Sequence, residues 1–162
     1  VASLPMCARV AVQGASECGK FLQVEAGWMS VRHAIGLDAL TCDPVDRAQQ
    51  LIGAPYLWGG RGGDALDCSG LVQLVLMLAG LAAPRDSDQQ MAALGRALGD
   101  DEPLERGDLV FFPGHVGIMA DTQTLVHANA FWMQVVAEPL ADVIARFPET
   151  TPQPVLARKR IG

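Results

Sequence analysis

A nearly continuous apolar segment with one thiol at its start most constrains how this chain can fold. Residues 65–80 read ALDCSGLVQLVLMLAG, and apolar residues continue to position 83. The segment is too short to cross a bilayer, and Gln73 and Gly80 interrupt it. We therefore expect a helix over residues 69–83 that is apolar nearly all round and buried inside a globular protein.

The composition supports a folded core around such a helix and excludes some partners. Half of the 162 residues are hydrophobic and 19% are charged, which is typical of a globular domain. The net charge is −6, and the basic residues form no stripe with interleaved aromatics, so we expect no nucleic-acid partner. The acidic balance also disfavours binding to an anionic membrane.

The periodicity predicts helices first and strands afterwards. We expect helices over residues 44–52, 69–83 and 88–98, the first of them capped by Asp43 and Pro44. After Gly107, alternation predicts strands over residues 109–112, 115–120, 124–128 and 133–137, a helix over 139–147 and a strand over 155–160. This order predicts an α+β fold with helices packed on an antiparallel sheet.

The first forty residues have a different pattern. Short strands are expected over residues 8–12, 21–24 and 28–31, with Glu25 to Gly27 as a hairpin turn. We therefore predict a small β domain over residues 1–40 and a larger domain over residues 41–162.

Cys68 lies where the glycine-rich loop meets the buried helix. The N–H groups and the positive end of the dipole at a helix start stabilise an anion, so we expect the pKa of this thiol to be lowered. A nucleophile with a rigid support is one interpretation. A structural cysteine that happens to begin a helix is the other. The sequence shows no zinc-ligand spacing, and the cysteine pattern does not require disulfides.

Two of the three histidines fall in neighbouring predicted strands. His115 begins HVGIM and His127 lies in TLVHAN, and the turn between them predicts an antiparallel hairpin. Side chains on one face of such a pair are about 5 to 8 Å apart, within reach of each other's rings. His33 is interpreted as a surface or packing residue.

Three motifs in this order resemble the NlpC/P60 cell-wall peptidases, a papain-like family. They are YLWGGRGGDALDCSGLVQ, RGDLVFF followed by GHVGIM, and LVHANA, and the resemblance covers residues 44–160. It implies a papain-like NlpC/P60 fold that needs no metal or other cofactor. By resemblance, Cys68 is the nucleophile, His115 the base and His127 the residue that orients the base.

The resemblance also implies a set of substrate-binding residues. Tyr56 matches a tyrosine beside the nucleophile, with loop packing as the alternative. The segment PRDSDQQ resembles one that lines the specificity pocket, where Arg85, Asp86 and Ser87 would contact the peptide. Ser87 or Asp88 alternatively caps the next helix, and Arg85 alternatively lies in water. The predicted substrate-binding set comprises Tyr56, Asp67, Ser69, Arg85, Asp86 and Ser87.

The N-terminal region, with GKFLQVEAGWMSVRHAIGLD, resembles the later part of a bacterial SH3-like domain, so we expect an incomplete SH3-like β segment there. The family resemblance implies hydrolysis of γ-D-glutamyl–diamino-acid bonds in murein stem peptides. No signal peptide is visible, which favours a cytoplasmic enzyme acting on small recycled peptides with a free N-terminal L-Ala. A signal removed before residue 1 would make the protein periplasmic or secreted.

Two other functions use the same residues. An acyltransferase would pass the acyl group from the thiol to an acceptor other than water. A catalytically silent module would bind cell-wall peptides without cleaving them, and its sequence mark would be loss of the cysteine or of the first histidine. Neither residue is lost here.

Overall fold

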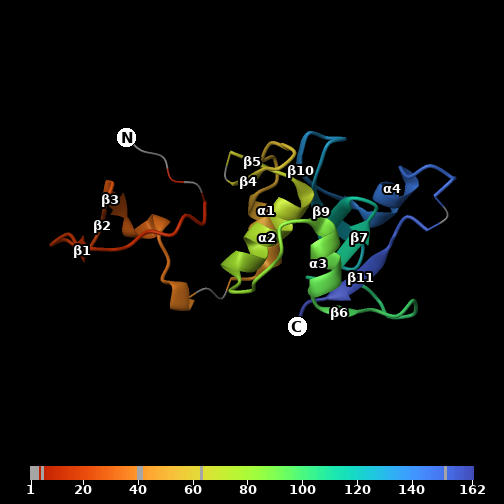
Figure 1. Cartoon of the computed structure of the whole chain (residues 1–162), viewed down its shortest axis with the longest axis horizontal. Helices are drawn as coiled ribbons and strands as arrows, with labels where there is room; N and C mark the ends of the chain where they lie inside the picture. Colours follow the sequence, from red (N-terminus) through yellow and green to blue (C-terminus); the bar gives the residue numbers. More distant parts are fainter. Residues whose placement is uncertain (1–3, 5, 40–41, 63, 152) are drawn as a thin grey trace.

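The computed structural model of this protein describes residues 4, 6–39, 42–62, 64–151 and 153–162. A small three-stranded sheet near the N-terminus is followed by helices and then by a six-stranded sheet (Figure 1). The predicted α+β class, with helices packed on an antiparallel sheet, is confirmed.

The large sheet has the strand order β10-β9-β8-β7-β11-β6, and neighbouring strands are antiparallel. Its strands are β6 (Arg96–Ala97), β7 (Leu109–Phe112), β8 (His115–Met119), β9 (Thr124–Asn129), β10 (Gln134–Pro139) and β11 (Ala157–Arg160). The predicted hairpin of β8 and β9 is present, with Ile118 opposite Val126. Strand β10 extends two residues beyond its predicted end and therefore includes Glu138.

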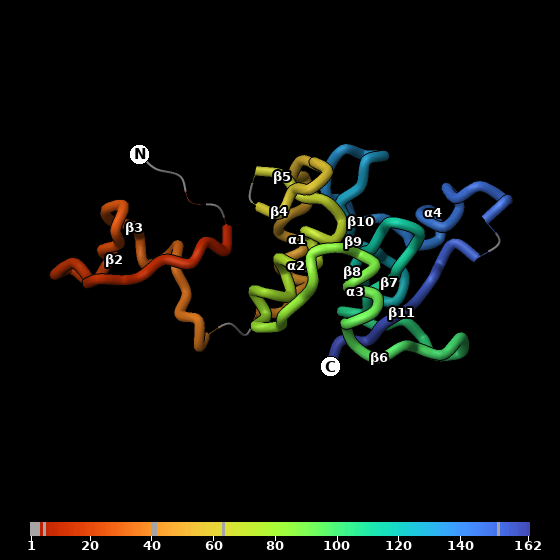
Figure 2. Tube along the Cα trace, in the orientation of Figure 1, coloured from red at the N-terminus to blue at the C-terminus, as the bar shows by residue number. Residues whose placement is uncertain are grey.

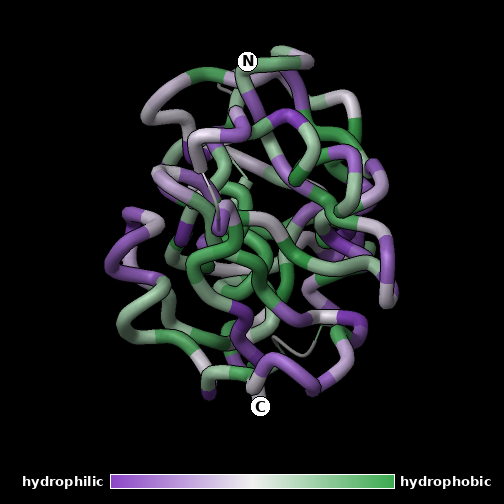
Figure 3. The backbone as a smooth tube through the Cα atoms, turned by 90° about the vertical axis from the view of Figure 1, so that its right-hand side faces the viewer, coloured by the Kyte–Doolittle hydropathy of each residue, from purple (hydrophilic) through white to green (hydrophobic). Residues whose placement is uncertain are grey.

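Helices cover both faces of this sheet. Helices α1 (Pro44–Gln50) and α2 (Cys68–Leu78) pack with Leu109 and Phe111 in one buried cluster. The alternate residues of β7, Val110 and Phe112, pack in a second cluster with α4 (Leu140–Ala145). Fully burying each side chain of this size stabilises the fold by about 1.5–3 kcal/mol. Figure 3 shows hydrophobic segments gathered in the middle of the molecule.

Helix α2 is shorter than predicted because glycine stops it. Gly80 adopts a left-handed φ of 79°, and its N–H donates to the carbonyl of Met77 while the N–H of Leu81 donates to that of Leu76. This pair of bonds is a Schellman motif, which glycine favours. The helix therefore ends at Leu78 rather than at residue 83. None of the helices formed by the described residues is long and apolar enough to span a bilayer.

Helix α3 (Ser87–Ala93) is also shorter than predicted, and its cap differs. Gly95 turns the chain at a φ of 52°, and the following residues join the sheet as β6. The N-cap is Asp86, whose side chain makes no capping hydrogen bond. The alternative that Ser87 or Asp88 is the N-cap does not hold, because the helix begins one residue earlier than expected. The predicted cap of α1 is confirmed, with Asp43 accepting from the N–H of Val45 at 2.7 Å.

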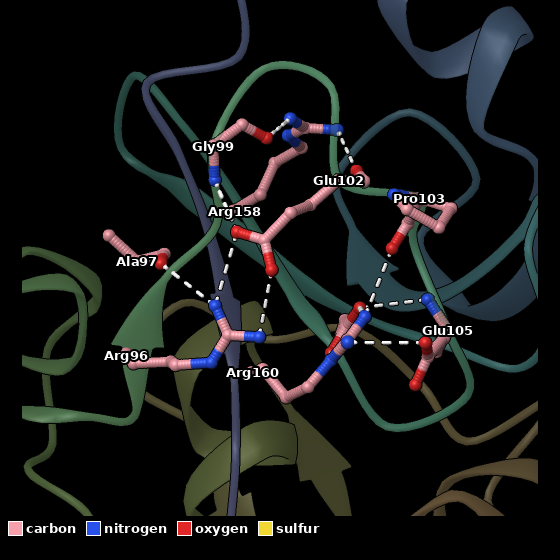
Figure 4. A network of polar contacts seen from close by, with 9 residues as sticks. Arg96, Ala97, Gly99, Glu102, Pro103, Glu105, Arg158 and Arg160 are labelled. Carbon is pink, nitrogen blue, oxygen red and sulfur yellow. Dashed lines mark hydrogen bonds and ion pairs between the residues drawn. The ribbon is translucent and has the colours of Figure 1, made fainter.

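A network of arginines ties the segment between β6 and β7 to the last strand (Figure 4). Arg160 donates to both carboxylate oxygens of Asp108, at 3.0 and 2.9 Å, and to the carbonyl of Pro103 at 3.0 Å. Arg96 pairs with Glu102, and Arg158 donates to the carbonyls of Gly99 and Glu102. These arginines are occupied within the chain, so we assign the network to structure.

The small sheet has the order β1-β2-β3, from Gly14–Ala15, Phe21–Val24 and Gly27–Ser30. The strand predicted over residues 8–12 is not formed, since pairing with β2 begins only at Gln13, whose N–H donates to the carbonyl of Gln23. Two 3-10 turns, Val31–His33 and Leu37–Ala39, follow. Figure 2 traces the chain through this part of the molecule, from β2 and β3 onward. The boundary predicted between residues 40 and 41 lies outside the described residues, and the SH3-like assignment stays a prediction.

Candidate active site

Cys68 is the first residue of α2 and is nearly buried, with 8% of its surface exposed. Its Sγ lies 4.0 Å from the carbonyl oxygen of Gly114 and close to the N–H of Val116. The sulfur thus contacts the backbone on both sides of His115, at the start of β8. This contact brings together the two segments that the sequence singled out, 46 residues apart.

The expected lowering of the Cys68 pKa was wrong. Burial raises the pKa of the thiol above its ordinary value, and the charge of Asp67 raises it further. The N–H groups of Val116, Ser69 and Cys68 act in the opposite direction and do not outweigh burial. The expected N–H donors at the helix start are present, but the loss of water around the sulfur has the larger effect on its pKa.

Asp67 is the N-cap of α2 and the centre of a buried network. Its carboxylate accepts from the N–H of Gly70 at 2.7 Å and from the N–H of Gly59 at 2.8 Å. Arg85 donates to both of its oxygens, and also to the hydroxyl of Ser69 at 2.9 Å. Burial alone would raise the pKa of Asp67, but these hydrogen bonds hold it below its ordinary value.

This network changes the interpretation of three predicted substrate-binding residues. The guanidinium of Arg85 is bound within the chain, so the alternative that it lies in water does not hold, and it is not free to bind a substrate carboxylate. Asp67 and Ser69 are likewise occupied, and both are buried. All three nevertheless line the cavity beside Cys68, and their contacts hold the loop at Gly59 and Gly60 against the start of α2.

The cavity beside Cys68 has a volume of about 610 Å³. Every predicted substrate-binding residue lines it: Tyr56, Asp67, Ser69, Arg85, Asp86 and Ser87. The sequence analysis did not identify Trp58 and Met91, which line it as well. Burial, and then the charges of Cys68 and Asp67, raise the pKa of Tyr56, so its phenol keeps its proton near neutral pH.

The two candidate histidines contact each other directly. Nε2 of His115 lies 2.7 Å from Nδ1 of His127, and the rings meet edge to face. Burial, with the charges of His127 and Arg146, lowers the pKa of His115 to about 3. Burial also lowers the pKa of His127, against the opposing effect of Glu138. Both rings are therefore neutral near pH 7, and a neutral imidazole can accept a proton.

Glu138 is a residue of this site that the sequence analysis missed. Its Oε1 lies 2.6 Å from Nε2 of His127, and its Oε2 accepts from Arg146 at 2.8 Å and from the indole of Trp132 at 3.2 Å. In β10, Val136 is opposite His127, so Glu138 is a diagonal neighbour on the same face. The available signal was an acidic residue in a strand next to the second histidine strand, but it required the register.

The thiol, the two histidines and Glu138 together form an arrangement suited to nucleophilic catalysis. A thiol at a helix start faces a cavity, and a neutral histidine pair backed by a carboxylate lies at the adjoining strand. Such a set can transfer an acyl group through a thioester. Among the residues described, no three His, Cys, Asp or Glu side chains are grouped so as to hold a metal ion.

The sequence is similar to known peptidases over this region. A family model described as the NlpC/P60 family matches residues 53–145. A probable endopeptidase of Corynebacterium glutamicum is 42% identical over 87 residues, which are 52% of this chain and 41% of that protein. A gamma-D-glutamyl-L-lysine dipeptidyl-peptidase of Bacillus cereus is 39% identical over 70 residues, which are 43% of this chain and 20% of that protein.

Solved structures share the fold. A NlpC/P60 family protein from Bacillus cereus has a TM-score of 0.74 at 21% identity, covering 95% of this chain and 54% of the other. The P60 domain of a Mycobacterium avium subspecies paratuberculosis antigen has a TM-score of 0.60 at 27% identity, covering 78% of this chain and 98% of the other. The NlpC/P60 fold expected from the resemblance is confirmed. The matched region spans 41% and 20% of these two curated relatives.

Proposed function

The chain belongs to the NlpC/P60 family, and we propose that it is a cysteine peptidase that hydrolyses γ-D-glutamyl–diamino-acid bonds in bacterial cell-wall peptides. The observation that carries the proposal is the contact of the Cys68 sulfur with the backbone on both sides of His115, in a cavity large enough for a peptide. Similarity to a gamma-D-glutamyl-L-lysine dipeptidyl-peptidase supports the bond that is cleaved.

In the proposed reaction, Cys68 attacks the γ-carbonyl carbon of the D-glutamyl residue while its proton passes to His115. Because burial raises the pKa of the thiol and lowers that of the imidazole, both groups are neutral before attack, and the proton moves as the C–S bond forms. His115 then gives this proton to the leaving amine and the C–N bond breaks. Water hydrolyses the thioester, with His115 accepting its proton and returning it to the sulfur.

We propose that two groups stabilise the oxyanion. The N–H of Cys68 belongs to the first turn of α2, where amide protons lack partners inside the helix. Tyr56 lines the same cavity, and its raised pKa keeps a proton on the phenol. We assign the first donor to the Cys68 amide and the second to Tyr56.

For the substrate, we propose a small peptide whose free N-terminal ammonium is held at the start of α3. Asp86 lines the cavity, is exposed and makes no capping bond, so its carboxylate can face a ligand. Ser87 beside it offers a hydroxyl. Arg85 directs its guanidinium N–H groups to Asp67 rather than to Asp86, so it forms no hydrogen bond that would occupy the Asp86 carboxylate.

Turnover of L-Ala-γ-D-Glu-diaminopimelate in H₂¹⁸O tests the reaction. We expect one ¹⁸O in the γ-carboxylate of the released L-Ala-D-Glu, which distinguishes hydrolysis from acyl transfer to another acceptor. No turnover would favour a silent binding module.

The N-acetylated peptide tests the ammonium site. In the proposed complex the bound peptide covers Asp86, so loss of the ammonium leaves a carboxylate without its partner and away from water, which costs about 1–3 kcal/mol and lowers kcat/KM about ten- to a hundredfold. Asp86→Asn should remove most of this preference, while Asp100→Asn, at an exposed carboxylate outside the cavity, serves as the control. Equal kcat/KM values for the free and the acetylated peptide in the wild type would refute the ammonium site.

A further inference from the structure

We propose that Glu138 is a positioning residue whose carboxylate fixes the proton positions in both histidines, so that His115 presents an unprotonated ring nitrogen to Cys68. This inference rests on the proposed peptidase function only for its consequence in catalysis. The proton positions themselves follow from the contacts of the described side chains.

The charge of Glu138 determines which atom holds the proton in its hydrogen bond with His127. The carboxylate receives hydrogen bonds from Arg146 on both oxygens and from Trp132 on Oε2. Although burial opposes ionisation, these bonds hold the pKa of Glu138 at about 2, so the group is an anion at neutral pH. An ionised carboxylate only accepts hydrogen bonds. The proton in the 2.6 Å contact therefore lies on Nε2 of His127.

The proton position on His127 determines the proton position on His115. A neutral imidazole has one N–H, so His127 with its proton on Nε2 has a bare Nδ1. That nitrogen accepts across 2.7 Å from Nε2 of His115, which must carry the proton of its own ring. Nδ1 of His115 is then the unprotonated nitrogen of that ring, because Nε2 of His115 is bonded to His127. This is the nitrogen that a base for Cys68 requires.

Asn129 shows why the carboxylate is needed. Its Oδ1 accepts from the backbone N–H of Trp132 at 2.8 Å, which turns its amide nitrogen toward Nε2 of His127 at 3.0 Å. While Nε2 donates to Glu138, it cannot accept from Asn129. Without the carboxylate, the Asn129 amide would donate to Nε2 and move the His127 proton to Nδ1. His115 would then carry its proton on Nδ1 and would no longer serve as a base.

Glu138→Gln is the most informative variant, because it keeps the shape of the side chain and reverses the proton positions on the two histidines. An amide oxygen in the Oε2 position accepts from Nη1 of Arg146 and from Trp132, and the NH₂ group then faces His127 and a single fixed donor, Nη2 of Arg146. The opposite orientation would point the NH₂ group at two fixed donors, Nη1 of Arg146 and the indole of Trp132. We therefore expect the glutamine to donate to Nε2 of His127. Glu105→Gln is the matched control, since Glu105 is exposed and pairs with Arg160 away from the histidines.

Histidine ¹⁵N NMR combined with steady-state kinetics on L-Ala-γ-D-Glu-diaminopimelate tests the inference. We expect Nε2–H tautomers for His115 and His127 in the wild type and in Glu105→Gln. In Glu138→Gln we expect Nδ1–H tautomers, with kcat lowered about a hundredfold or more and KM little changed, since a reversed tautomer disables the base.

The outcomes separate this inference from the proposed function. Nδ1–H tautomers in the wild type would overturn the inference, and so would unchanged tautomers and kcat in a folded Glu138→Gln. If that variant does not fold, the wild-type spectrum still decides the proton order. The expected tautomers in a protein without turnover would uphold the proton order and refute the peptidase function.

Discussion

Replacing Arg85 by methionine removes the guanidinium from Asp67 and keeps much of the apolar stem. The structure places Arg85 on both oxygens of Asp67, with 25% of the Arg85 side chain and 10% of the Asp67 side chain exposed. Breaking a buried ion pair by removing one partner costs about 3–5 kcal/mol, because a buried charge is left behind. Asp67 keeps the N–H groups of Gly59 and Gly70, and water reaches the Arg85 position. We therefore expect a smaller loss, about 2–3 kcal/mol.

Urea unfolding at pH 7 measures this loss directly, and thermal unfolding should show a Tm lower by about 4–12 °C. Arg96→Met is the control, since Arg96 and Glu102 form an exposed pair, and its free energy of unfolding should change by less than about 1 kcal/mol. In Arg85→Met, KM for the peptide substrate should stay within about threefold of the wild type. An unchanged urea midpoint together with a KM raised more than tenfold would refute the structural assignment and make Arg85 a substrate ligand.

The pH dependence of the same variant gives a second check. The pKa of Asp67 in the folded protein is below its ordinary value of 3.8, so its contribution to stability is present above that pH and is lost as the pH falls through the folded pKa. Arg85 provides much of this lowering. The difference in free energy of unfolding between wild type and Arg85→Met should therefore be largest at neutral pH and shrink below about pH 4.

Three further predictions concern the thiols and the histidine chain. Iodoacetamide at pH 7 should label Cys18 before Cys68. Cys18 is exposed and hydrogen bonds, chiefly from Ser16, lower its pKa, whereas burial raises the pKa of Cys68. Faster labelling of Cys68 in peptide mapping would contradict this prediction. His115→Ala should abolish turnover, whereas His127→Asn should keep part of kcat, because an amide oxygen can still accept from His115; the reverse ranking would exchange their roles. Glu138 lends stability that is lost as the pH falls from about 4.5 to about 2, so urea midpoints of Glu138→Gln should fall less over this range than those of the wild type.

Local patterns were sufficient to predict the elements that carry the site. The Asp43–Pro44 start of α1, strand β7 and the β8–β9 hairpin follow from capping residues and alternation, and the structure contains them. The end of α2 could also have been predicted from the sequence, because a glycine such as Gly80 within an apolar run favours a left-handed helix cap. Only the length of the apolar segment argued for a longer helix.

The contacts behind the reacting groups could not be predicted in the same way. Glu138 depends on the register of β10 against β9, and its partner Arg146 follows α4. Arg85 lies 18 residues from Asp67, and nothing in its local sequence says where the guanidinium points. The pKa of Cys68 depends on burial, which neighbouring residues do not determine. Each miss concerns a quantity set by tertiary packing.

Arg85 and Arg146 each pair with a carboxylate that lies beside one of the reacting groups. Asp67 caps the helix that begins with Cys68, but its negative charge raises the pKa of the thiol that it positions. Glu138 orders the histidines, but a carboxylate in so buried a place is unfavourable unless it is paired. Arg85 and Arg146 each provide that pairing, so one carboxylate can hold the nucleophile and the other can hold the base. Because the two pairs belong to different elements, the position of the sulfur and the proton order of the imidazoles are fixed separately, and a variant in one pair should leave the other measurement unchanged.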